Sequence, residues 1–132
     1  MTLYADSSAL LKRYVDEPDS EKSNELLESD PQVLTARLTI VEVRRNLYRL
    51  LDPEAAIDAC INFVKDMEAI AIIELDAATC ELAAMIAEQT NARTLDALHL
   101  AAAKRIGPTV SFLTFDVRQA DVARRIGLHA IP

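Results

Sequence analysis

The sequence predicts a single α/β domain with a mostly parallel central sheet of about five short strands and helices on both faces. Short apolar runs alternate with stretches in which apolar residues recur at helical spacing, in the order β-α-α-β-α-α-β-α-α-β-α-β. This alternation is typical of a parallel sheet covered by helices. The length of 132 residues and the apolar fraction of 51% suit one core. Only two glycines occur, and no flexible linker divides residues 1–132.

Each strand is expected where a short run of β-branched or apolar residues interrupts the helical spacing of apolar residues. These runs cover residues 2–5, 32–36, 69–75, 110–115 and 128–131, the last at the edge of the sheet. The helices are expected where apolar residues recur every three or four positions. They cover residues 7–14, 20–27, 39–51, 53–67, 77–89, 94–106 and 117–126. Proline and glycine mark several of the ends, among them Pro31, Pro108 and Gly127.

The charge balance limits the classes of partner. The chain has 14 basic and 21 acidic residues, a net charge of −7, which argues against broad nucleic-acid binding driven by the overall field. It permits a local basic strip and a site where carboxylates gather around a cation. Because no membrane span and no signal peptide are visible, we expect a cytoplasmic protein without membrane contact. Cys60 and Cys80 are expected as buried thiols without a disulfide.

The helix at residues 94–106 carries a carboxylate that its apolar pattern does not explain. Thr94 is the expected N-cap, and an apolar stripe that begins at Leu95 is expected to face the core. Asp96 lies about 120° from the centre of that stripe. An acid in the first turn gains roughly 0.3–1 kcal/mol from the helix dipole, which is the structural explanation. The functional explanation is that Asp96 belongs to a site.

The helix at residues 39–51 allows the same two interpretations. Thr39 as N-cap and Glu42 three residues later fit a capping box. Glu42, Arg45 and Arg49 also share one face of the helix. They form either an ordinary row of ion pairs or a catalytic acid beside arginines that contact phosphates, a role that the planar guanidinium suits.

Two further acids, Asp6 and Asp116, follow predicted strands at the edge where α/β sheets bind ligands. Helix starts share this edge, so Glu42 and Asp96 can join them. Two carboxylates about 4 Å apart repel by roughly 4 kcal/mol, whereas a cap returns only ~1 kcal/mol. Convergence of all four therefore requires a hard cation, Mg²⁺ or Mn²⁺, which activates water for attack on a phosphodiester.

The chain resembles the PIN-domain ribonucleases, and more narrowly the VapC-type toxins of VapBC toxin–antitoxin pairs. The matching segments fall in the family's order at residues 3–14, 38–44, 94–101 and 112–116. The resemblance implies a PIN-like fold over residues 1–132 and a Mg²⁺- or Mn²⁺-dependent endoribonuclease acting on RNA. It also implies an antitoxin partner and a homodimer. The acidic residues of the family carry over onto Asp6, Glu42, Asp96 and Asp116.

Three other side chains are candidates for supporting roles at this site. Ser7 and Thr114 have hydroxyls able to bond a carboxylate or a bound water, although such hydroxyls commonly serve the backbone. His99, one turn after Asp96, is expected as a hydrogen-bonded neighbour of the site rather than a metal ligand. Two alternatives to the nuclease stay open: a catalytically silent RNA- or protein-binding module, and a phospho-accepting receiver domain. The receiver ranks lowest because Ser7, not an acid, follows Asp6, and no lysine follows Lys104.

Overall fold

The computed structural model describes residues 2–132 and contains one five-stranded sheet in the order β3-β2-β1-β4-β5. Every strand pairing is parallel. The strands are β1 (Thr2–Ala5), β2 (Val33–Ala36), β3 (Ala71–Ile73), β4 (Val110–Leu113) and β5 (His129–Ile131). The order of elements and the edge position of the last strand confirm the predicted α/β fold.

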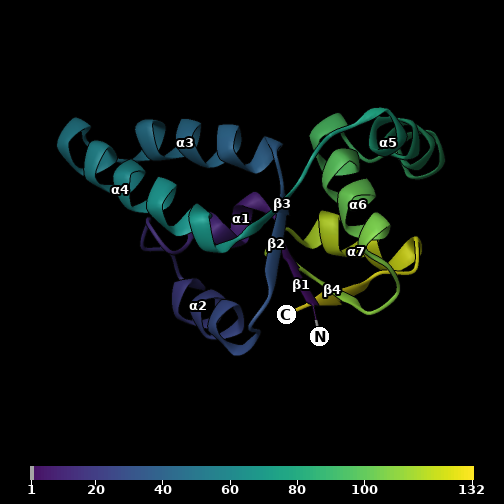
Figure 1. Cartoon of the computed structure of the whole chain (residues 1–132), viewed down its shortest axis with the longest axis horizontal. Helices are drawn as coiled ribbons and strands as arrows, with labels where there is room; N and C mark the ends of the chain where they lie inside the picture. Colours follow the sequence, from purple (N-terminus) through teal and green to yellow (C-terminus); the bar gives the residue numbers. More distant parts are fainter. Residues whose placement is uncertain (1) are drawn as a thin grey trace.

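Within residues 2–132, seven α-helices cover the two faces of the sheet. They are α1 (Ser7–Leu11), α2 (Ser20–Ser29), α3 (Leu38–Leu50), α4 (Pro53–Asp66), α5 (Ala77–Thr90), α6 (Thr94–Ile106) and α7 (Val117–Arg125). A short 3₁₀ turn, η1 (Met67–Ala69), precedes β3. Figure 1 views the sheet close to edge-on, with α1 to α4 on one side and α5 to α7 on the other. None of the helices within residues 2–132 is long and apolar enough to cross a membrane.

The central strand β1 divides the core into two layers. Leu3 and Ala5 point to the side of α1, α3 and α4, where they join a buried apolar cluster with Phe63. Tyr4 points to the opposite side, where it stacks on Phe112 at a centroid distance of 5.3 Å beneath α6. Because successive side chains of a strand point to opposite faces of the sheet, the side-chain hydroxyl of Tyr4 lies under α6.

The apolar stripe predicted for α6 is wrong in part. Leu95 is 49% exposed, whereas the buried face consists largely of alanines, with Ala97 and Ala101 fully covered. Small side chains let α6 pack closely against the sheet and α5, and this close approach selects the alanine face over the face with the larger residues. Thr94 is not the N-cap either: Arg93 holds that position, without a side-chain cap bond.

Two further local expectations are also wrong. Helix α3 begins at Leu38, so Thr39 already lies in the first turn, where its buried hydroxyl bonds the Thr35 hydroxyl at 2.7 Å. The capping box with Glu42 therefore does not form. Cys60 is buried as expected, but Cys80 is exposed because α5 turns Thr79 and Ala83 toward the core instead.

Candidate active site

Asp6 is the first residue after β1 and the most deeply buried of the four predicted acids, at 5% exposure. Its Oδ1 accepts hydrogen bonds from the Ser8 hydroxyl at 2.6 Å and from the Ala9 N–H at 3.2 Å, so it also caps α1. Burial raises the pKa of the Asp6 carboxyl, and the nearby His99 and the Ser8 and Thr114 hydroxyls offset part of that rise. The structural and functional explanations of Asp6 are thus compatible.

Asp116 lies just beyond β4, the strand that pairs with β1. Its Oδ1 caps α7 by accepting from the N–H groups of Arg118 at 2.9 Å and Gln119 at 3.3 Å. The buried Thr114 hydroxyl accepts from the Asp116 N–H at 3.1 Å and so holds the turn between β4 and α7. The turn fixes the Asp116 carboxylate at the carboxyl edge of the sheet.

Asp96 in the first turn of α6 faces Asp116 through a shared arginine. Arg93 Nε lies 3.4 Å from Asp96 Oδ2, and Arg93 Nη2 lies 3.9 Å from Asp116 Oδ2. Burial raises the pKa of the Asp96 carboxyl; Arg93 lowers it in part and the charge of Asp116 raises it further. The buried Gln119 side chain donates to the Asp96 carbonyl at 3.0 Å, which ties α6 to α7 at this point.

Glu42 in α3 reaches the site through His99 rather than through a helix cap. Glu42 Oε1 lies 2.6 Å from His99 Nε2, and His99 Nδ1 lies 2.6 Å from the Tyr4 hydroxyl oxygen. His99 is 2% exposed, so this Tyr4–His99–Glu42 chain is shielded from water. The expectation of His99 as a hydrogen-bonded neighbour of the site agrees with this placement.

The chemistry of the three groups fixes the direction of the bond to Glu42. An ionised carboxylate only accepts hydrogen bonds, so His99 Nε2 carries the proton that it donates to Glu42. Burial, followed by the nearby charge of Asp6, raises the pKa of the Tyr4 phenol well above its usual value, so Tyr4 stays protonated. Its hydroxyl donates to Nδ1 when the imidazole of His99 is neutral and accepts from Nδ1–H when the imidazole is charged, and in both cases Nε2–H faces Glu42.

The four predicted acids come to one edge of the sheet, where two basic side chains lie near them. His99 bonds Glu42 and lies close enough to lower the pKa values of Asp6 and Asp96, and Arg93 joins Asp96 to Asp116. Within residues 2–132, no three His, Cys, Asp or Glu side chains stand close enough together to form a ready metal site. His99 and Arg93 limit the mutual repulsion that four clustered carboxylates would suffer.

Three of the remaining predicted residues, Arg45, Arg49 and Ser7, contact none of the four acids within residues 2–132. Arg45 and Arg49 are exposed on α3, and Arg49 bonds the Asn46 side chain at 3.1 and 3.2 Å. The serine that contacts Asp6 is Ser8 and not Ser7; the Ser8 hydroxyl also accepts from the Phe115 N–H at 3.1 Å. Ser7 and Ser8 stand side by side after Asp6, and nothing in the sequence indicates which of the two contacts the carboxylate.

Sequence reasoning missed Arg93 and Tyr4. Arg93 stands three residues before Asp96, a spacing that allows an ion pair and could have marked it. The role of Tyr4 depends on a contact with His99 across 95 positions of the chain. No local pattern reports such a contact.

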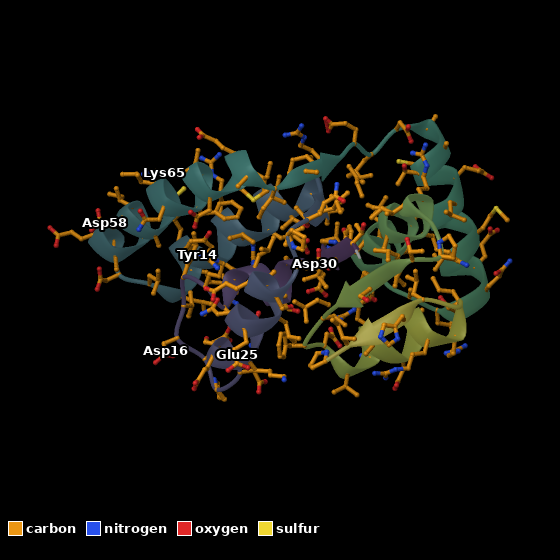
Figure 2. All side chains as sticks on the ribbon, turned by 60° about the horizontal axis from the view of Figure 1, so that its bottom comes forward. Tyr14, Asp16, Glu25, Asp30, Asp58 and Lys65 are labelled. Atoms are coloured by element: carbon orange, nitrogen blue, oxygen red, sulfur yellow. The ribbon has the colours of Figure 1, made fainter. Side chains whose placement is uncertain are left out.

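A surface hollow of about 500 Å³ lies away from this site. It contains none of the four acids and lies among α1, α2 and the end of α4. Tyr14 and Lys65, which line it, are labelled in Figure 2 at the end of the molecule away from α5 and α7. Tyr14 donates there to Asp66 Oδ2 at 2.6 Å. The candidate site is assigned by the chemistry of its groups and not by the size of a hollow.

Comparisons with known proteins find relatives that match nearly the whole chain. The PIN domain family matches residues 3–125 of the chain. Ribonuclease VapC46 from Mycobacterium tuberculosis is 33% identical over 131 residues, which cover 98% of this chain and 95% of the relative.

Solved structures share the fold at lower sequence identity. FitAcB from Neisseria gonorrhoeae matches with a TM-score of 0.79 and 16% identity, covering 98% of this chain and 96% of that one. VapC20 from Mycobacterium tuberculosis, described as a Sarcin-Ricin loop cleaving toxin, matches with a TM-score of 0.75 and 18% identity, covering 90% and 93%. DNA-bound VapBC from Salmonella typhimurium matches with a TM-score of 0.73 and 13% identity over 99% and 97%. The family match and the VapC46 relative together show that this chain belongs to the PIN-domain family, among its VapC members.

Proposed function

We propose that this chain is a Mg²⁺- or Mn²⁺-dependent endoribonuclease that hydrolyses RNA phosphodiester bonds, and that it is the toxin of a toxin–antitoxin pair. One observation carries the proposal: four acids from distant parts of the chain, Asp6 after β1, Glu42 in α3, Asp96 in α6 and Asp116 after β4, come to the carboxyl edge of one parallel sheet. A structural role explains a cap at Asp6 or Asp116, but it does not explain Glu42 on a buried histidine. The 33% identity to Ribonuclease VapC46 supports the choice of reaction.

The donor set fits a hard divalent cation. All four side chains offer carboxylate oxygens, which Mg²⁺ and Mn²⁺ prefer. Asp6 is a buried acid whose hydrogen bonds from Ser8 and Ala9 both end on Oδ1, and no basic side chain pairs with it among residues 2–132. We propose Asp6, Glu42, Asp96 and Asp116 as the groups that hold the ion, directly or through water.

The other residues of the proposed site position the acids and bind the phosphates of the RNA. A bound divalent ion polarises the phosphate ester and lowers the pKa of a water molecule next to it. Tyr4 and His99 orient Glu42 by the chain of hydrogen bonds described above, and Thr114 and Ser8 hold the turns that carry Asp116 and Asp6. Arg93 offers its charge to the phosphate as well as to the acids. Arg45 and Arg49 are proposed as further phosphate contacts on α3.

The test compares cleavage of a mixed-sequence RNA by the wild type and by Asp96→Asn, with Mg²⁺ or Mn²⁺ and with a chelator. Asparagine keeps the shape of the side chain and removes its charge. We expect cleavage that requires the metal and that disappears in the folded variant. Equal cleavage by both proteins contradicts the proposal, because it places the activity elsewhere. If neither cleaves RNA and neither binds Mn²⁺ in calorimetry, the chain is instead the catalytically silent binding module.

A protein antitoxin and a second copy of the chain are proposed as partners, in the cytoplasm. Structural neighbours include toxin–antitoxin complexes, and the outer faces of α3 and α4 expose several large apolar side chains. Val41 is 69% exposed, Tyr48 55% and Ile61 63%. Clustered exposed apolar residues mark surfaces that bind other proteins. Light scattering at several concentrations measures the oligomeric state, and a monomer at all concentrations contradicts the homodimer.

A further inference from the structure

A hollow of about 310 Å³ opens directly beside Asp96, between α7 and the segment that joins α5 to α6. Its walls include Arg93, Arg118 and Arg125 together with Asp96 and Asp121. The volume lies at the lower end of the range of small-molecule sites, about 300–1,000 Å³. The hollow shares Asp96 and Arg93 with the acidic site, so whatever fills it lies against that site.

The positive charges of this hollow are only partly neutralised. Arg93 contacts Asp96 and Asp116, and Asp121 pairs with Arg124 outside the hollow at 3.7 Å. Arg118 and Arg125 form no ion pair with any residue in the range 2–132. They are seven positions apart in α7 and therefore lie on one face of that helix. Two guanidinium groups are thus available to an outside anion.

A second hollow of about 330 Å³ continues this surface. It shares Thr90 and Arg125 with the first and adds Lys104 from the last turn of α6. Lys104 also lacks an ion pair within the described part of the chain. We call Arg93, Arg118, Arg125 and Lys104 the basic strip. It leads away from the acidic site along two adjoining hollows.

We propose that the basic strip holds the phosphates of the RNA strand on one side of the bond that the acidic site cleaves. The inference rests on the proposed nuclease function. A net charge of −7 repels RNA at long range, so binding needs a local row of cations, and guanidinium groups match phosphate geometry. The buried Gln119 fastens α7 to the Asp96 carbonyl, which keeps the strip at a fixed distance from the acids. An acidic protein segment is the competing occupant, but it gives no reason for the first hollow to share Arg93 and Asp96 with the acidic site.

The experiment measures the affinity of the purified chain for short single-stranded RNA of mixed sequence, by fluorescence anisotropy with a chelator present to prevent cleavage. The test variant is Arg118→Ala/Arg125→Ala. The matched control is Lys22→Ala/Lys65→Ala, which removes the same charge from exposed positions on α2 and α4. Figure 2 labels Lys65 at the end of the molecule away from α7. We expect the test variant to bind about tenfold more weakly and the control to bind as the wild type does.

Two further readouts identify the cause of any loss. The magnitude of the slope of log affinity against log salt concentration should fall by about 0.7 per lost phosphate contact in the test variant. Its Mn²⁺ affinity should equal that of the wild type, because neither arginine side chain pairs with any of the four acids and alanine keeps the backbone N–H of residue 118 that Asp116 accepts. Unchanged RNA affinity in the test variant, or an equal loss in the control, overturns the inference.

The outcomes also separate this inference from the function on which it rests. If the wild type cleaves RNA but the test variant binds RNA normally, the strip is wrong and the nuclease stands. If the test variant loses affinity for polyglutamate and not for RNA, the strip serves an acidic protein partner and the inference is overturned. If the wild type neither binds nor cleaves RNA, both fail together.

Discussion

Replacing Tyr4 with phenylalanine tests how Glu42 is positioned. The variant removes one oxygen and keeps the ring that stacks on Phe112. The lost atom is the partner of His99 Nδ1 at 2.6 Å, in a place with no access to water. His99 then keeps its bond to Glu42 but loses the contact that fixes the orientation of its ring.

The expected magnitudes follow from the burial of these groups. A buried nitrogen left without a partner costs about 1–3 kcal/mol, so the free energy of unfolding of Tyr4→Phe should fall by that amount. Loss of a group that orients a metal ligand reduces metal affinity by roughly 10- to 100-fold. Glu42 receives its bond from His99, so Mn²⁺ affinity should fall within that range.

The assay is Mn²⁺ calorimetry together with urea unfolding, with Tyr14→Phe as the control. Tyr14 also loses a 2.6 Å hydrogen bond, to Asp66, and it packs edge-on against Phe63 far from the four acids. We expect Tyr14→Phe to be less stable than the wild type but to bind Mn²⁺ equally well. If Tyr4→Phe loses stability and binds Mn²⁺ as the wild type does, Tyr4 only supports the core and the reasoning is refuted.

Two other predictions concern charges. Arg93→Ala should bind Mn²⁺ a few-fold more tightly than the wild type, because the Arg93 guanidinium competes with the ion for Asp96 and Asp116. The size of the effect follows from the ion pairs that are lost, since an exposed ion pair contributes about 0.2–1 kcal/mol. Weaker Mn²⁺ binding by the variant in calorimetry contradicts this prediction. Hydrogen bonds from the Thr79 N–H and hydroxyl, and then from Arg105, lower the pKa of the exposed Asp76 to about 2. The ionised Asp76 therefore stabilises α5 fully above the usual pKa near 3.8, and this stabilisation is lost as the pH falls toward 2. In urea unfolding, the free energy of unfolding of Asp76→Asn should be below that of the wild type at neutral pH and should approach it between pH 3.8 and 2.

The order and type of the elements could be predicted because they depend on local patterns. Apolar runs such as residues 110–113 alternate with helical spacing, and a carboxylate that follows a strand must lie at its end. For that reason Asp6 and Asp116 could be placed at one edge of the sheet from the sequence alone. Parallel strands share that edge whatever side chains cover the helices.

What could not be predicted depends on which face of a helix approaches the sheet. The size of Leu95 suggested a buried residue, but the alanines of α6 pack closer and leave Leu95 half exposed. His99 faces Tyr4 only because α6 has this rotation over β1. The Thr39 cap failed for a similar reason, since the Thr35 hydroxyl across the turn determines where that side chain points.

The proposed acidic site and basic strip together account for how a protein with a net charge of −7 binds an anionic strand. At physiological ionic strength charges are screened beyond about 8 Å, so the distant acidic residues repel RNA weakly and the groups near the strand determine binding. In the proposed complex the RNA contacts Arg118 and Arg125 and also reaches the four acids. Arg93 stands between the two regions and contacts both Asp96 and Asp116. Because contacts with phosphates carry no sequence information, we expect the basic strip to position the strand over the acids and the choice of RNA target to depend on other contacts.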